Sequence, residues 1–171
     1  TSQAQDGTGN AGSVNVEVTG AVEILNGGEI SSGTFTEGNA GTVQVVAGSL
    51  TLDGQENGVA FISSDANRGS TGDAGNVDVW VAAGAVEILN GGEITSSTFG
   101  DGNAGTVQVE AGSLGVAGQG GRQESSSITS QGQDGTGNAG VVNAVVTGAV
   151  EILNGAEISA RTFAWAHAGP V

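Results

Sequence analysis

The chain has 171 residues, 33 of them glycine, and contains no cysteine, methionine or tyrosine. Its 18 acidic residues face three arginines and no lysine, and the net charge of −15 argues against nucleic acid or an anionic membrane as a partner. The lack of cysteine excludes disulfides and thiolate zinc sites, and no apolar run approaches the ~18 residues of a membrane span. Because the sequence has no methionine, we expect a processed product or a segment of something longer.

The sequence repeats itself at a fixed period. GAVEILNGGEI begins at Gly20 and Gly84, and GAVEILNGAEI begins at Gly148, so the two steps are equal. Each period contains two related halves, marked by the last glycine of a Gly-Asn/Asp-Ala-Gly turn. Shorter and longer intervals alternate between these glycines, which are Gly12, Gly41, Gly75, Gly105, Gly140 and, in a degenerate form, Gly169. The pattern predicts five stacked units and a partial one at the start.

Each unit contains three short runs in which apolar and polar residues alternate. In the first unit these are residues 13–18, 21–25 and 29–32, separated by glycine or Asn-Gly. A period of two predicts strands, and no apolar spacing predicts a helix. The same order in every unit predicts an all-β, right-handed parallel β-helix (solenoid) with about five coils of three strands. We expect one domain over residues 1–171, with an atypical tail or cap at 164–171.

Stacked coils place equivalent residues in columns. We expect two interior columns: Val14, Val43, Val77, Val107 and Val142, and Ile30, Ile62, Ile94, Ile128 and Ile158. The first Gly-Asn-Ala-Gly turn lies within a G-x-G-x-x-G pattern, Gly7 to Gly12, which is typical of dinucleotide loops. Here a strand follows the pattern where such a loop requires a helix, so we reject a nucleotide site. We predict instead a ladder of turn side chains formed by Asn10, Asn39, Asp73, Asn103 and Asn138.

Few residues suit catalysis. His167 is the single histidine, and we expect it to belong to a frayed or capping terminus. The stronger candidates are six glutamates that recur once in each full period: Glu23, Glu29, Glu87, Glu93, Glu151 and Glu157. An active site is normally single, so we interpret these columns as a solvated face, with a weak Ca²⁺ site as the alternative. No other metal, cofactor or catalytic residue is predicted.

Large outward-facing residues also recur. Leu25, Leu89 and Leu153, like Phe35, Phe99 and Phe163, are spaced by the same full period. We expect them to pack at corners, or alternatively to form an apolar strip for lateral association. Trp80 occupies an outward position where it could stack on a sugar.

The units GNAGTVQVVAGSLTLDG and AVEILNGGEISSGTFTEGNAG resemble the repeats of filamentous-haemagglutinin-like exoproteins, which the two-partner route secretes, especially the large cyanobacterial ones. The resemblance covers Thr1 to about Phe163. It implies a right-handed β-helical shaft, exported to the cell surface or the medium and used in adhesion or display. The tail AWAHAGPV departs from the pattern.

Two classes of function remain open. The first is a structural or adhesive shaft segment that self-associates end to end or continues a longer array, with surface glycans as a further partner. The second is a polysaccharide-binding or polysaccharide-active domain. The short loops, and three arginines on different coils, favour the first. A unique site would most readily lie in the longest departures from the repeat, residues 55–61 and 118–127.

Overall fold

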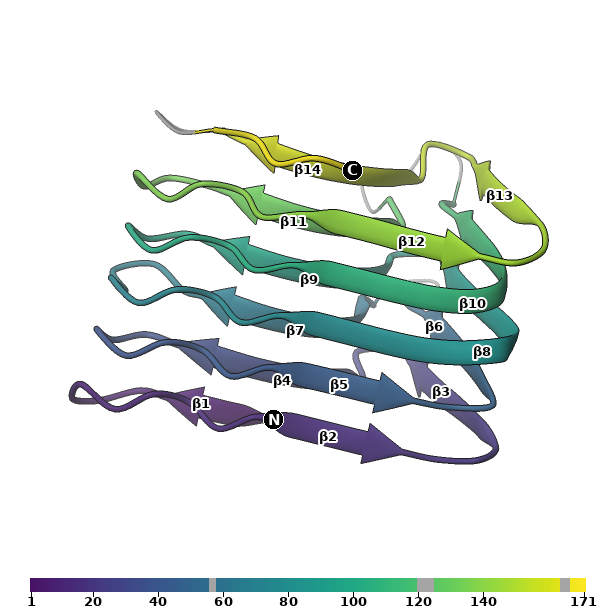
Figure 1. The fold of residues 1–171 in the computed structure, drawn as a ribbon, viewed down its shortest axis with the longest axis horizontal. Helices are drawn as coiled ribbons and strands as arrows, with labels where there is room; N and C mark the ends of the chain where they lie inside the picture. Colours follow the sequence, from purple (N-terminus) through teal and green to yellow (C-terminus); the bar gives the residue numbers. More distant parts are fainter. Residues whose placement is uncertain (56–57, 120–124, 164–166) are drawn as a thin grey trace.

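The computed structural model describes residues 1–55, 58–119, 125–163 and 167–171. Within these ranges the chain is a parallel β-solenoid of about five turns and contains no helix (Figure 1). Every strand pair is parallel and joins residues of consecutive coils. The all-β solenoid prediction is confirmed, whereas right-handed winding stays a prediction. No described segment could cross a membrane as a helix.

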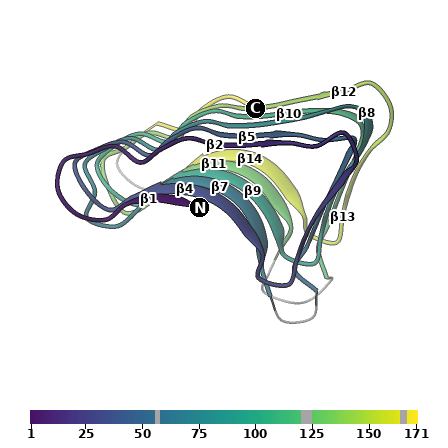
Figure 2. The same cartoon turned by 90° about the horizontal axis from the view of Figure 1, so that it is seen from below.

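The coils have three faces, seen end on in Figure 2. The first face contains β2 (Val14–Glu17), β5 (Val43–Val46), the first halves of β8 (Val77–Leu89) and β10 (Val107–Ala117), and β12 (Val142–Val146). The second contains β3 (Ala21–Leu25), β6 (Ser49–Asp53), the second halves of β8 and β10, and β13 (Val150–Leu153). The third contains β1 (Ser2–Ala4), β4 (Glu29–Thr34), β7 (Ala60–Ala66), β9 (Gly92–Thr98), β11 (Ser127–Gly132) and β14 (Glu157–Thr162).

Two middle coils differ from the three-strand prediction. In β8 and β10 the first two predicted runs form one strand that bends around a corner. Their pairing shifts there, because Ala111 pairs with Val81 but Ser113 pairs with Ala85. The bend falls at a glycine in β10, Gly112, where an added Cβ would meet the backbone of the coil below. A corner without a side chain therefore lets the strand turn while the coils stay in contact.

The core fills the space between the three faces. Both predicted interior columns are confirmed by the strand register, and their central members have no exposed surface. In the last coil the inward positions of β13 are different: Val150 is 51% exposed and Ile152 is 45% exposed. Their partners in the preceding coils, such as Val86 and Ile88, are fully buried. The core is thus open at this end.

Tight turns join the second and third faces in alternate coils. Asn26 and Gly27 both have positive φ, at 45° and 85°, as an Asn-Gly turn of the primed type requires. The turn at residues 52–55, where an Asp-Gly pair replaces Asn-Gly, is built differently. Its residue of positive φ is Gln55, at 58°, while Gly54 packs against neighbouring carbonyl groups. The glycine is needed there for close approach.

Candidate functional site

The Gly-Asn-Ala-Gly turns join each coil to the next. The side-chain oxygen of Asn10 accepts the backbone N–H of Asn39 at 2.8 Å, and Asn39 does the same for Asp73 at 2.8 Å. The series continues in the next three turns. The side-chain oxygen of Asp73 accepts the backbone N–H of Asn103 at 2.6 Å, that of Asn103 accepts the N–H of Asn138 at 3.1 Å, and that of Asn138 accepts the N–H of His167 at 2.9 Å. The predicted ladder residues therefore bond mainly from side chain to backbone. Among the described rungs, direct hydrogen bonds between side chains occur in two places only. The Asn103 side-chain amide donates to the Asp73 carboxylate, and the Asn138 amide donates to the side-chain oxygen of Asn103.

The glycines of these turns permit direct contact between backbones. A Cβ on Gly38 would overlap the carbonyl oxygen of Gly9, and the same clash recurs at Gly72, Gly102 and Gly137. The last glycine of each later turn is equally restricted, because a Cβ on Gly75 would overlap the carbonyl oxygen of Gly41. Above the first coil only glycine fits either column at this spacing, whereas a Cβ on Gly9, which has no coil below it, would meet nothing within 4 Å. Backbone stacking thus explains the G-x-G-x-x-G pattern in its second copy, Gly135 to Gly140, whereas in the first copy Gly7 has a positive φ of 83°.

A serine column behind the turns was not predicted. The Ser64 hydroxyl donates to the carbonyl of Gly41 at 2.9 Å and accepts the N–H of Gly75 at 2.8 Å. Ser32, Ser96 and Ser130 repeat both bonds in their coils. All four hydroxyls lie on almost fully buried residues. Strand alternation could have found them, since each serine lies two positions after an inward isoleucine.

The tail continues the stack where it is described. The backbone N–H of His167 completes the asparagine ladder, and the Pro170 carbonyl accepts the N–H of Val142 at 3.1 Å. Residues 167–171 thus follow the path of the preceding turns, residues 164–166 lie outside the described residues, and a cap at this end stays a prediction. Ala160 occupies the serine column here, so the last turn lacks that hydroxyl.

The six glutamates are dispersed. Glu23, Glu87 and Glu151 lie on the second face, where Thr51 and Gly115 separate them. Glu29, Glu93 and Glu157 lie on the third face, where Phe61 and Ser127 separate them. Glu157 is paired with Arg161. The described part of the chain has no group of three or more acidic or histidine side chains suited to a metal ion. A weak calcium site at these glutamates stays a prediction.

The recurring apolar residues do not form a continuous strip. Along the outer corner of the second face Leu25, Leu89 and Leu153 alternate with Asp53 and Ala117. At the end of the third face, the backbone bonds place Asn67 between Phe35 and Phe99, and Gln133 between Phe99 and Phe163. Trp80 lies half-buried on the first face between Val46 and Glu110.

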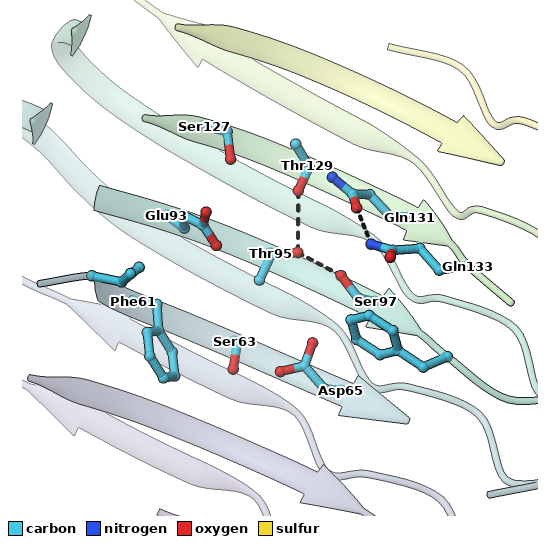
Figure 3. Close-up of a pocket in the computed structure, with 12 residues that line it drawn as sticks. Phe61, Ser63, Asp65, Glu93, Thr95, Ser97, Ser127, Thr129, Gln131 and Gln133 are labelled. Carbon is cyan, nitrogen blue, oxygen red and sulfur yellow. Dashed lines mark hydrogen bonds between the residues drawn. The ribbon is translucent and has the colours of Figure 1, made fainter. Parts of the chain in front are cut away.

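The third face carries a hollow on its outer side. Figure 2 shows this sheet curved, with its outer side concave. A cavity of about 390 Å³ lies over β7, β9 and β11, lined mainly by hydroxyl, amide and carboxyl side chains with two phenylalanines (Figure 3). A second cavity of about 190 Å³ extends over β4. Of the two long departures from the repeat, residues 56–57 and 120–124 lie outside the described residues.

Asp65 is a buried carboxyl group of this hollow with a perturbed pKa. Burial raises its pKa to about 6, and the negative charges of Glu93 and Glu29 act in the same direction. The Ser63 hydroxyl and the backbone N–H of Ser97 oppose the rise. Sequence reasoning missed Asp65, because its equivalents in other coils are Gly33, Ser97, Gln131 and Arg161.

Comparison with protein-family models, curated proteins and solved structures found no match to this chain.

Proposed function

We propose that the chain is a structural, non-catalytic shaft segment of a secreted or cell-surface exoprotein of the filamentous-haemagglutinin-like kind, serving adhesion or display. One observation carries this proposal. The asparagine, glycine and serine columns make nearly the same contact between every pair of consecutive coils. A contact that repeats without change can be extended, which is how solenoids lengthen. The sequence resemblance supports the assignment to this class of exoprotein.

The open core supports continuation of the stack. Val150 and Ile152 face inward but are half exposed, and β12, β13 and β14 each have one edge without a paired strand among the described residues. Unpaired edges and exposed apolar side chains favour a further strand on each face. We infer that a coil of the same repeat covers this end, supplied by the same polypeptide or by a second copy.

A second copy meets a steric constraint. If β2 of an upper copy paired with β12, then β1 of that copy would occupy the level already filled by β14. Its residues 9–12 would likewise fall on the level of residues 167–170, because these stack directly on residues 138–141. Head-to-tail association on all three faces therefore requires residues 1–12 of the upper copy to move away.

Sedimentation velocity tests this form of self-association. The whole chain should associate weakly, and more strongly at high salt, because screening reduces repulsion between copies of charge −15. A variant lacking residues 1–12 should associate more strongly than the whole chain. Calcium chloride and magnesium chloride at matched ionic strength should act alike. A strict monomer in high salt for both chains would leave only continuation within one polypeptide.

A polysaccharide-active enzyme is the second candidate, favoured by the raised pKa of Asp65 and by Glu93 in the same hollow. Paired carboxyl groups are the usual machinery of glycoside hydrolysis. Against it, no described histidine or arginine lines either cavity of the third face. We predict no turnover of pectin, alginate, hyaluronan or neutral glucans. The proposal would be contradicted by turnover of any of these polymers that is lost in one of four variants: Asp65→Asn, Glu93→Gln, Glu23→Gln or Glu87→Gln.

A further inference from the structure

The two cavities of the third face form one trough along the solenoid axis. They share Phe61, Ser63 and Asp65, and together they extend over β4, β7, β9 and β11. Adjacent strands lie ~4.8 Å apart, so four strands present a surface on the order of 15 Å long. The trough is open and lies on the concave side of the sheet (Figures 2 and 3).

Hydroxyl groups repeat along the floor of the trough. The Thr129 hydroxyl donates to Thr95 at 3.1 Å, and the hydroxyls of Thr95 and Ser97 lie 2.8 Å apart (Figure 3). Gln131 and Gln133 extend the polar surface toward the turns. A hydroxyl both donates and accepts, so this floor can exchange hydrogen bonds with ligand hydroxyls in either direction.

Ser63 marks a place for a polar ligand atom. Ser63 is 1% exposed, and its hydroxyl has no hydrogen-bond partner of acceptable geometry among the described residues. The hydroxyl still lies near enough to the Asp65 carboxyl group to lower the pKa of Asp65. Strand alternation directs it away from the core and into the trough, beside Phe61. Buried polar groups without partners are uncommon and costly. A ligand hydroxyl placed here would satisfy this one.

Two aromatic rings border the polar floor. Phe61 and Phe99 are both half-buried and both line the larger cavity. A ring that keeps one face accessible can pack against the apolar face of a sugar ring. Hydroxyl groups beside aromatic rings are the combination that recognises a pyranose, which has a polar rim and an apolar face.

Charge and backbone pairing narrow the ligand. The lining contains the largely buried carboxyl group of Asp65, which disfavours uronate, sulfated and sialylated chains. The strands of the floor are paired on both sides, so they offer no backbone edge for an added peptide strand. An uncharged, hydroxyl-rich polymer fits both conditions.

We propose that the trough over β4, β7, β9 and β11 binds an extended neutral oligosaccharide of hexopyranose units. The coil spacing is close to the length of one such unit in an extended chain, so successive sugars meet equivalent rungs. Phe61 packs against a ring, and Ser63, Asp65 and Thr95 bind ring hydroxyls. The shaft proposal does not depend on this inference.

Isothermal titration calorimetry of the whole chain tests the inference with cellohexaose, mannohexaose and laminarihexaose, and with an oligogalacturonate as the anionic counterpart. At least one neutral hexasaccharide should bind, and the oligogalacturonate should bind more weakly. Phe61→Ala should weaken binding by about tenfold, the loss of one aromatic contact. Asp65→Asn and Thr95→Val should each weaken it measurably.

Matched variants on the first face provide the control. Val46→Ala shortens an outward apolar side chain, and Asp78→Asn changes an outward carboxyl group whose pKa is also raised by burial. Both should leave binding unchanged, and circular dichroism should confirm that every variant is folded. The inference is overturned if none of the neutral probes binds at millimolar concentration, or if the oligogalacturonate binds best. The inference would also be overturned if the variants of the first face lost as much affinity for the oligosaccharide as those of the third face.

Discussion

Replacing Ser64 with alanine should destabilise the fold far more than its small volume change implies. The hydroxyl is fully buried, donates to the Gly41 carbonyl at 2.9 Å and accepts the Gly75 N–H at 2.8 Å. Removing it leaves two buried backbone groups without that partner, each at a cost of about 1–3 kcal/mol. We therefore expect the free energy of unfolding to fall by about 2–6 kcal/mol, measured by urea denaturation followed by circular dichroism.

The chain contains its own controls for this experiment. Ser2 occupies the same column in the first coil, but it makes only the bond to Gly12 and is partly exposed. Ser2→Ala should cost less than about 1 kcal/mol. Ser63→Ala, on the same strand as Ser64, should not destabilise the fold, because the Ser63 hydroxyl has no partner of acceptable geometry. Ala160→Ser should stabilise the last coil. The reasoning is refuted if Ser64→Ala and Ser2→Ala are equally mild with unchanged denaturant slopes.

Gly38→Ala should destabilise the fold by about 1–3 kcal/mol, because the added Cβ would overlap the Gly9 carbonyl. Gly9→Ala should be tolerated, because a Cβ there meets nothing within 4 Å. Equal melting temperatures for the two variants would contradict the stacking argument. The raised pKa of Asp65 means that the folded state holds a proton the unfolded state releases, so stability should fall as pH rises from about 4 to about 6. Asp65→Asn should flatten this part of the pH profile and stabilise the protein at pH 7, by up to about 3 kcal/mol; an unchanged profile would show that Asp65 is not desolvated.

The columns were predictable because two local signals agree. Alternation fixes which side chains face inward, and the identities between periods fix which coils are equivalent, so Val43 and Ile62 could be assigned to a buried column from letters alone. The buried serines follow the same alternation, but a polar residue carries no signal of burial. Ser64 is buried because two glycine backbones approach it, which only the stacked structure reveals.

The hollow of the third face was less predictable. Its lining comes from residues that are individually ordinary, and Asp65 is perturbed by neighbours from other coils, Glu29 and Glu93. The concavity depends on how the whole sheet curves (Figure 2). The glutamates were the more visible signal because they recur, yet the strand register separates them by intervening coils. Recurrence in the sequence therefore indicated a structural repeat, and of the carboxyl groups that line the two cavities it pointed to Glu29 and Glu93 but missed Asp65.

An internal duplication tests the central claim, that the shaft lengthens by identical coil-on-coil contacts. A second copy of residues 42–105, inserted after Gly105, adds one full period and leaves both ends unchanged. Small-angle X-ray scattering should show a particle longer by about 10 Å, two coil spacings, with the same cross-section. The melting temperature should not fall, because each added coil brings its own contacts. A wider particle of unchanged length, or an inserted period that stays unfolded, would contradict the account.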